Sequence, residues 1–320
     1  MPEPYKNLTD RDQFHDYDCA AQQDQNVTPL TFNREFTPGY GELVEVTPLI
    51  RRLVAPNSGP FTAWGTGTYV IGRGKVAIID PGPADATHID TLHRHLAGEQ
   101  VTDLVITHTH MDHSPGAALL KQRTGARVAG CGPHGARGET TEAGADYDFR
   151  PDLQLHDGEQ VKGPGWTLTA VTTPGHTSNH LCFCLEQEQS LFTGDHVMGW
   201  STTVISPPDG DMTAYMASLA KLAARADRLF YPTHGAPIAA PQTYVCQLIA
   251  HRIERETQVL ACVECGIPTI EGMVERLYAG IDPRLHRAAG RSVQAHLLKL
   301  ISEGRVRCIG DGEAARFLMK

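Results

Sequence analysis

The sequence predicts a layered α/β domain followed by a small helical module, and three observations support this. Short β-rich runs alternate with helical spacings in two successive halves, from residue 43 to about residue 240. A single long helix is expected over residues 241–265. Residues 266–320 then supply two more helices and a hairpin. Helix, helix, helix, hairpin is the order of a winged helix-turn-helix module.

The first half begins after a polar stretch, residues 1–42, which we expect to form a surface extension that is partly disordered. The β-rich runs that follow are LVEV, TYVIG and KVAIID, and Gly72-Arg73-Gly74 is a hairpin signal between the last two. A helix is predicted in PADATHIDTLHRHLAG, and its His88, His93 and His95 are expected to face solvent. The strand TDLVIT and a helix in PGAALLKQRTG come next.

The second half and the C-terminal module follow the same logic. The runs ARVAG, WTLTAVTT, HLCFCLE and SLFTG read as strands, MTAYMASLAKLAARADRL as a periodic helix, and LFYPTHG as a strand that enters a loop. In the module, TIEGMVERLYAG is a short helix opened by Thr269. RSVQAHLLKLISEG is a helix that ends at Gly304, and RVRCIGDGEAARFL is a hairpin.

Composition excludes several classes of protein. The formal net charge of −9 argues against broad electrostatic binding of nucleic acid. No apolar run reaches the roughly 18–20 residues that a membrane span needs, and the N-terminus lacks a signal-peptide core, so we expect a soluble, cytoplasmic protein. The eight cysteines are expected to be reduced, with Cys262 and Cys265 an incidental pair on a helix.

The stretch THTHMDHSPG places three histidines and an aspartate within six residues, directly after a short apolar run. On an extended chain His108 and His110 point the same way and could coordinate one metal ion together. Asp112 and His113 follow where the chain turns, so a second ion is plausible. Neutral imidazole and carboxylate are ligands typical of zinc.

More candidate ligands lie at strand ends further along the chain, where functional groups are usually presented. His176 follows a strand in TTPGHTSNH, Asp195 ends a strand in LFTGDHV, and His234 ends another in YPTHGAP. The carboxylate of Asp195 could bridge two ions. His180 is expected near the rim of the site, with either a catalytic or a structural role.

The motifs THTHMDH, PGHTSNH, FTGDHV and YPTHGAP closely resemble those of the metallo-β-lactamase fold superfamily of hydrolases, over roughly residues 43–240. The resemblance implies an αββα sandwich with a dinuclear site on its edge. It implies that one metal is held by His108, His110 and His176, a second by Asp112, His113 and His234, with Asp195 bridging and Asp80 of IIDPG fixing the ligand loop.

The resemblance also implies a mechanism. Water held between two divalent cations loses its proton near neutral pH and attacks a carbonyl or phosphoryl centre. Zinc is the expected metal, with iron and manganese as alternatives. Asp112 is expected to be both ligand and partner of this water, and His180 to assist substrate or proton transfer. His196, Tyr215 and Trp64 are expected to serve structural roles.

A narrower resemblance bears on the substrate. The stretches GTGTYVIG and SPPDGDMTAYMASLAKL, together with the helical tail, resemble the lactamase-beta-2-like group, whose animal members are single-strand endoribonucleases. Gly67 and Ser114-Pro115 depart from the group's and superfamily's usual residues. We expect a hydrolase of a small ester, thioester or lactone; a single-strand endoribonuclease is the alternative. The seven predicted ligands argue against a third hypothesis, a non-enzymatic DNA-binding regulator.

The charge of the tail adds some support to the alternative of a nucleic-acid substrate. Residues 271–320 hold nine Lys or Arg and six Asp or Glu, a local excess of three positive charges. Five arginines are expected to cluster around the third helix and the wing: Arg284, Arg287, Arg291, Arg305 and Arg307. A homodimer formed through this region is a further hypothesis, and no contact with a membrane is expected.

Overall fold

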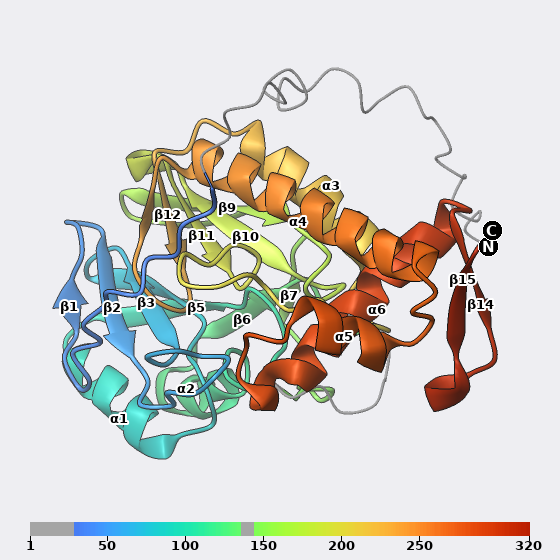
Figure 1. Ribbon diagram of the computed structural model, residues 1–320. Coiled ribbons are helices and arrows are strands. Elements are labelled where there is room, and N and C mark those ends of the chain that lie inside the picture. The colour runs from blue at the N-terminus through green and yellow to red at the C-terminus, as the bar shows by residue number, and fades with distance from the viewer. Residues whose placement is uncertain (1–28, 136–143) are drawn as a thin grey trace, which may run out of the picture.

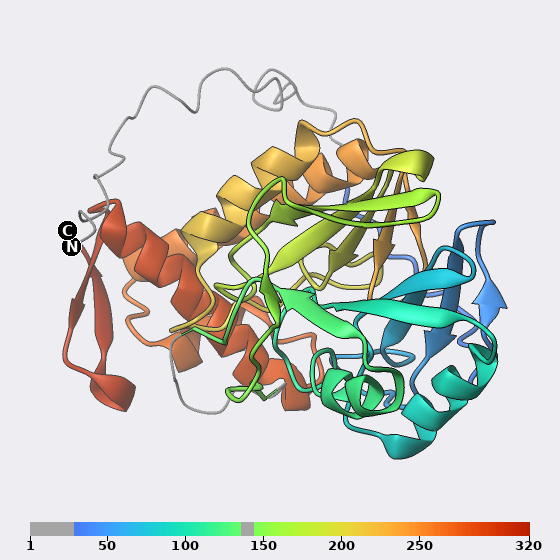
Figure 2. The ribbon, with the colours of Figure 1, turned by 180° about the vertical axis from the view of Figure 1, so that it is seen from behind.

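The protein is described by a computed structural model that covers residues 29–135 and 144–320. Two β-sheets face one another, and helices cover the outer face of each sheet (Figures 1 and 2). The order of layers is therefore helix, sheet, sheet, helix, as the resemblance implied. A smaller helical domain with its own hairpin follows at the C-terminus.

The first sheet has its strands in sequence order from β1 to β7. Its members are β1 (Val44–Glu45), β2 (Ile50–Val54), β3 (Gly67–Ile71), β4 (Lys75–Ile79), β5 (Gln100–Val105), β6 (Arg127–Gly130) and β7 (Leu153–Gln154). The strands from β1 to β4 pair antiparallel, whereas β4, β5, β6 and β7 pair parallel. The parallel strands end together at one edge of the sheet.

The second sheet has the order β13-β12-β11-β10-β9-β8. Its members are β8 (Gln160–Gly163), β9 (Trp166–Thr172), β10 (Leu181–Leu185), β11 (Ser190–Gly194), β12 (Leu229–Pro232) and β13 (Ile238–Ala239). Antiparallel pairing of β10 with both β9 and β11, and parallel pairing of β11 with β12, makes β9, β11 and β12 run the same way. Three further strand ends therefore share one edge.

Strand alternation explains how the layers hold together. Tyr69 and Phe192 point into the space between the sheets, where their rings meet at 4.9 Å. Their neighbours Val70 and Leu191 point outward into two other cores. Because successive side chains of a strand face opposite sides, fully buried strands can supply two cores at once.

Four helices bury their apolar faces against these outer cores. α1 (Ala86–His95) and α2 (Gly116–Thr124) cover the first sheet, and α3 (Met212–Ala223) and α4 (Pro241–Glu264) cover the second (Figure 1). Asp85 caps α1 by accepting hydrogen bonds from two backbone N–H groups, and Asp211 caps α3 in the same way with one.

In the first half, the sequence analysis missed one strand and misplaced one histidine. Ile50–Val54 is a fully buried strand that the pattern did not suggest, because Arg51 and Arg52 interrupt the apolar run. Arg51 is buried through its pair with Glu99, at 2.5 Å between Nη1 and Oε1. His88 does not face solvent: it is buried, with Nε2 at 3.2 Å from the hydroxyl of Thr68.

The C-terminal domain has the predicted order of elements. α5 (Ile270–Leu277) is capped by Thr269, α6 (His286–Ser302) is followed by Gly304, and β14 (Val306–Ile309) pairs with β15 (Arg316–Met319). α6 begins earlier than its sequence pattern suggested. The end of α4 packs into the same core as α5 and α6, through residues such as Val263.

Residues 29–42 have no helix or strand, yet they pack against the body of the molecule. The amide of Asn33 donates to the carbonyl of Gly199 at 2.8 Å, and the guanidinium of Arg52 lies 4.4 Å from the centroid of the Phe36 ring. The first part of the predicted extension, residues 1–28, lies outside the described residues.

Two further expectations concern the whole chain. The cysteines within the described ranges are all free thiols, with Cys262 buried and Cys265 exposed at the end of α4. No helix in the described residues combines the length and apolar character required to cross a bilayer.

Candidate active site

Strand ends from both sheets meet at one edge of the sandwich and present the histidines and aspartates singled out above. Asp80 follows β4, the histidine loop follows β5, and His176 follows β9. Asp195 follows β11, and His234 follows β12. Open α/β sheets generally bind their ligands at the carboxyl ends of strands. The convergence of these ends makes this edge the candidate active site.

The first of two ligand groups consists of His108, His110, His176 and Asp195. One ligand atom from each residue lies within 4.8 Å of all the others. Nδ1 of His110 is 2.9 Å from Nε2 of His108 and 3.1 Å from Nε2 of His176. Three imidazole nitrogens therefore face one point.

The second group consists of Asp112, His113 and His234, which meet the same distance limit. Oδ2 of Asp112 lies 3.3 Å from Nε2 of His113 and 3.3 Å from Nε2 of His234. The hydroxyl of Thr66 donates to the same oxygen of Asp112 at 3.1 Å. This carboxylate is thereby held between the two imidazoles.

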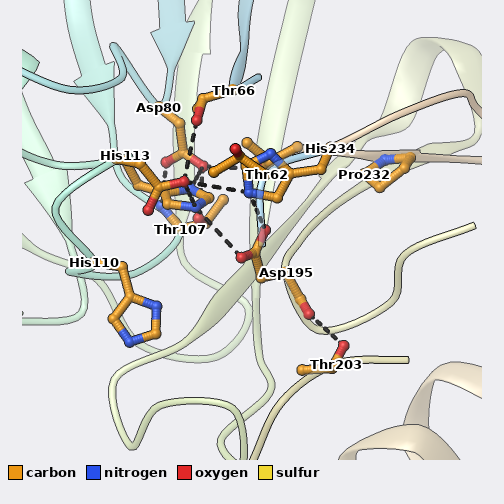
Figure 3. A network of polar contacts seen from close by, with 12 residues as sticks. Thr62, Thr66, Asp80, Thr107, His110, His113, Asp195, Thr203, Pro232 and His234 are labelled. Carbon is orange, nitrogen blue, oxygen red and sulfur yellow. Dashed lines mark hydrogen bonds and ion pairs between the residues drawn. The ribbon is translucent and has the colours of Figure 1, made fainter. Parts of the chain in front are cut away.

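Asp195 faces both groups, as expected of a bridging residue. Its Oδ2 lies 3.8 Å from Nε2 of His176 in the first group and 3.5 Å from Nε2 of His113 in the second. Its Oδ1 lies 3.3 Å from Nε2 of His234. The hydroxyl of Thr203 donates to the backbone carbonyl of Asp195 at 2.6 Å and fixes the loop after β11 (Figure 3).

Hydrogen bonds on the far side of each imidazole decide which nitrogen faces the site. Nδ1 of His176 lies 2.7 Å from the carbonyl of Val204, and Nδ1 of His234 lies 3.0 Å from the carbonyl of Gly65. A carbonyl only accepts, so Nδ1 carries a proton in both rings and Nε2 is the nitrogen presented to the site.

Asp80 orders the histidine loop, and Figure 3 shows it in contact with Thr107 and His113. Its carboxylate accepts the backbone N–H of Thr107 at 2.8 Å and the Thr107 hydroxyl at 2.7 Å. Nδ1 of His113 donates to it at 2.9 Å, so that Nε2 faces the second group. Asp80 itself has a φ of +47° and no solvent exposure, and such local strain is often found at functional sites.

The histidine pKa values are lowered in the first ligand group and raised in the second. Burial, followed by the neighbouring imidazoles, lowers the pKa of His108 and His110 well below the usual value, so both are neutral lone-pair donors. Burial also lowers the pKa of His234, but Asp195 and Asp112 outweigh it and raise that pKa to about 10. The same balance raises the pKa of His113 well above its usual value. The carboxylates therefore create a field that attracts positive charge.

These residues fit divalent metal ions. Ligands on a tetrahedral zinc at about 2.0–2.1 Å lie about 3.3–3.4 Å apart, close to the spacings observed here. Nε2 of His113 and Oδ1 of Asp195 are buried and make no hydrogen bond among the described residues, although each has an oppositely charged neighbour at 3.3 Å. Orphaned buried polar atoms are costly unless something binds them. An ion at each group would use both atoms.

His180 is not near the rim, contrary to the prediction. It has no solvent exposure, and Nδ1 lies 2.9 Å from the hydroxyl of Thr173. Its ring stacks against His108, with centroids 5.1 Å apart and an interplanar angle of 29°. From this position it supports a candidate ligand from behind, and a direct catalytic role stays a prediction.

The three other residues expected to be structural are found as follows. His196 is fully buried, with its ring 4.6 Å from that of Tyr215. The Tyr215 hydroxyl donates to the His196 carbonyl at 3.0 Å. Trp64 meets Trp200 edge to face at 6.4 Å and lies over Phe36.

A cavity of about 300 Å³ opens above the two groups, with Phe61, Met111 and Met198 among its apolar walls. Sequence reasoning missed two polar residues in this wall, His134 and Asp209. Nδ1 of His134 lies 2.8 Å from the Thr109 hydroxyl, and Nε2 lies 3.5 Å from Asp209. The stretch GPHG, a histidine between turn residues after a strand, was the signal available for His134.

The arginines that were predicted to cluster in the C-terminal domain lie in different surroundings. Arg287 and Arg291, from the first turns of α6, line the cavity above the ligand groups. Arg284 instead pairs with Asp282 at 2.7 Å. Arg305 lies 3.7 Å from a carboxylate oxygen of Glu303. The predicted cluster is therefore divided, and part of it belongs to the active-site wall.

Comparison with known proteins agrees with this geometry. Residues 62–234 match the family model of the metallo-beta-lactamase superfamily, and residues 269–315 match the beta-lactamase associated winged helix domain. A lactamase-like protein of Aspergillus niger is 31% identical over 303 residues, covering 88% of this chain and 89% of that protein. An atrochrysone carboxyl ACP thioesterase of Aspergillus fumigatus is 34% identical over 236 residues, covering 71% and 69%.

Solved structures extend the similarity to the whole fold. A beta-lactamase domain protein from Burkholderia ambifaria has a TM-score of 0.75 at 26% identity, covering 89% of this chain and 96% of that one. A metallo-beta-lactamase family protein from Thermus thermophilus has a TM-score of 0.70 at 25% identity, covering 86% and 100%. The chain is therefore a hydrolase that belongs to the metallo-beta-lactamase superfamily and carries the winged helix domain associated with it.

Proposed function

We propose that this protein is a dinuclear metal-dependent thioesterase. The observation that carries the proposal is the pair of adjoining ligand groups, each held within 4.8 Å, with Asp195 facing both. The choice of thioester over other small substrates is supported by relatives named as ACP thioesterases, among them the one from Aspergillus fumigatus. Zinc is the proposed metal because the ligands are imidazoles and carboxylates.

One metal would be held by His108, His110 and His176 and the other by Asp112, His113 and His234, with Asp195 shared between them. Two such ions supply Lewis acidity, which makes water nucleophilic at neutral pH and polarises a scissile carbonyl.

The protein's own residues prepare the site for this chemistry. The carbonyls of Val204 and Gly65 hold two imidazoles with Nδ1 turned away and Nε2 presented to the metal site. Phe61, Met111 and Met198 give the cavity apolar walls, which would limit the water around the reacting carbonyl. Asp112, close to the rim with its side chain 16% exposed, can take up a proton from the attacking water.

The test combines metal analysis with parallel assays. Purified protein is analysed for metal by mass spectrometry and supplied with an acyl-coenzyme A thioester, a lactone and a fluorescent single-stranded RNA. We expect about two metal ions per chain and turnover of the thioester. Asp195→Ala and His113→Ala should each lose both metal and turnover. Less than one ion per chain after metal-replete expression would remove the basis of the proposal.

The endoribonuclease stays an outcome of the same test. Cleavage of RNA that is lost in both variants, with the thioester inert, would replace the proposed thioesterase by a nuclease. Four of the tail arginines are divided between the active-site wall and pairs with carboxylates, which weakens the support that a continuous basic patch would give this alternative. The predicted homodimer and cytoplasmic location remain predictions.

A further inference from the structure

A second cavity lies beside the one above the ligand groups. Its volume is about 780 Å³, more than twice that of the first cavity. Phe61, Met198, Val204 and Ala288 line both cavities, so the two share a wall. The second cavity therefore adjoins the space above the ligand groups, where the reacting group of a substrate would lie.

Several parts of the chain that lie far apart in sequence build this second cavity. Phe32 and Arg34 come from the N-terminal segment, Trp200 from the loop after β11, and Arg252 and Arg255 from α4. The C-terminal domain closes it with residues between α5 and α6, and Figure 1 shows these two helices beside α4. The cavity thus exists only where the winged helix domain meets the catalytic domain.

The charge of this cavity is opposite to that of the protein. Arg34, Arg252 and Arg255 line it together with His251, and none of the described residues in its wall is acidic. The chain as a whole carries a net charge of −9. Arginine side chains are always protonated, so the cavity holds three fixed positive charges.

Of the three arginines, Arg252 gives the strongest evidence for an anion site. It is 3% exposed, Nη2 donates to the carbonyl of Thr203, and the guanidinium carbon lies 5.2 Å from the Tyr215 ring centroid. Nε has no hydrogen-bond partner, and no carboxylate in the described ranges lies within ion-pair distance of this side chain. A buried charge without a counter-charge is costly, so an anion that enters the cavity would gain affinity from it.

Aromatic rings form much of the remaining wall. Phe32, Phe61, Trp64, Trp200 and Tyr278 line the cavity. The indole Nε1 of Trp200 is buried and has no partner among the described residues. The guanidinium of Arg255 lies 4.3 Å from the Tyr278 ring centroid. Such a wall suits an apolar or planar stem that carries an anionic group.

We propose that the second cavity binds an oxyanion, a phosphate or a carboxylate, carried by the substrate on an apolar or aromatic stem away from its scissile thioester. The inference rests on the proposed thioesterase function. The oxyanion can come from either side of a thioester. The thiol side supplies a phosphate when it is a phosphopantetheine arm, and the acyl side supplies a carboxylate when it is an aromatic acid with a second carboxyl group besides the one in the thioester.

Tryptophan fluorescence reports on this cavity without any turnover. The chain has three tryptophans, of which Trp64 and Trp200 line the cavity, while Trp166 is buried between the sheets. The thiol-side probes are S-ethyl-coenzyme A and phosphate-free S-ethyl-pantetheine. Thioethers are used because a free thiol could bind a metal. The acyl-side probes are 2-naphthoate and its neutral amide.

We expect an anionic probe to change the fluorescence and its neutral counterpart to bind at least about tenfold more weakly. Arg252→Gln and Arg255→Gln should each weaken the anionic probe by about 10- to 100-fold. Arg228→Gln, which removes the same charge from an exposed residue outside the cavity, should leave its dissociation constant unchanged. If circular dichroism shows that Arg252→Gln is not folded, the inference is tested with Arg255→Gln and with Arg34→Gln, which replaces an exposed arginine.

The two probe pairs identify the source of the oxyanion. Preference for S-ethyl-coenzyme A alone assigns the cavity to the phosphate of the carrier arm, and preference for naphthoate alone assigns it to the acyl group. Equal binding of charged and neutral probes, or unchanged binding in the arginine variants, would overturn the inference. Anion binding without thioester turnover would refute the proposed function and leave the oxyanion site standing.

Discussion

The carboxylate of Asp80 offers the sharpest test of how the candidate metal site is built. The change is Asp80→Asn, which preserves side-chain size. Asparagine also tolerates the left-handed backbone that this position adopts, with a φ of +47°. The variant therefore removes one charge and turns one acceptor into a donor, with little disturbance of the main chain.

The contacts of the Asp80 carboxylate show which interactions the substitution would change. One oxygen of Asp80 accepts the backbone N–H of Thr107, and the other accepts two threonine hydroxyls and Nδ1 of His113. An amide that keeps the first contact turns its NH₂ toward the others. Hydroxyls can rotate to accept, so the stability loss is modest, about 1–3 kcal/mol. Nδ1 of His113 can accept only if its proton moves to Nε2, which then no longer ligates.

The expected result is a loss of metal larger than the loss of stability. Removing a group that orients a metal ligand costs about 10- to 100-fold in affinity, so the variant should lose the second ion to a chelator first. The assay is zinc competition against a chromophoric chelator, with thermal unfolding in parallel. Asp103→Asn is the matched control, because Asp103 is also buried and pairs with Arg127 at 2.6 Å, away from the site.

The control should lose a similar amount of stability and retain full metal affinity. Retention of two ions with wild-type affinity in Asp80→Asn would refute the reasoning that this carboxylate sets the tautomer of His113. Equal metal loss in both variants would show that the effect comes from general destabilisation.

Three further predictions address the support of the site and the pH response. In His180→Phe, which keeps a ring against His108, we expect kcat to fall less than about tenfold with an unchanged pH profile; a fall above about 100-fold would indicate direct catalysis. Gly194→Ala should destabilise by about 1–3 kcal/mol by thermal unfolding, because φ is +52° and its Cβ would lie 2.6 Å from Nε2 of His180; an unchanged midpoint would contradict this. The Arg51 guanidinium lowers the pKa of Glu99 below its ordinary 4.5, so their pair stabilises the fold above that pH and loses its effect as pH falls through the lowered folded-state pKa. Glu99→Gln should therefore cost about 1–3 kcal/mol at pH 7 and progressively less below pH 4.5 in urea unfolding, whereas a constant difference would exclude this linkage.

Local patterns carried most of the fold prediction. Alternation, helical spacing and turn residues depend on neighbours along the chain, so the two β-rich halves and the order of the C-terminal elements could be predicted. The strand Ile50–Val54 could not, because Arg51 is buried through Glu99, a partner distant in sequence. His88 was misplaced for the same reason, since its partner Thr68 lies on another element.

The candidate ligands themselves are a property of the sequence. Spacing placed His108 and His110 side by side, and turn residues marked His176 and His234 at strand ends. These signals are local, because a metal site needs several ligands of one chemical kind presented on loops. The sequence by itself therefore determined which residues are candidate ligands and in what order the chain presents them.

Only the tertiary structure decided how those residues act together. It selects the free nitrogen of His176 through the carbonyl of Val204, and it places His180 behind His108 instead of at the rim. It also buries Arg252 without a counter-charge beside a cavity shared by two domains. Burial, tautomer and charge compensation depend on groups brought together from distant parts of the chain, and no pattern along the sequence encodes those distances.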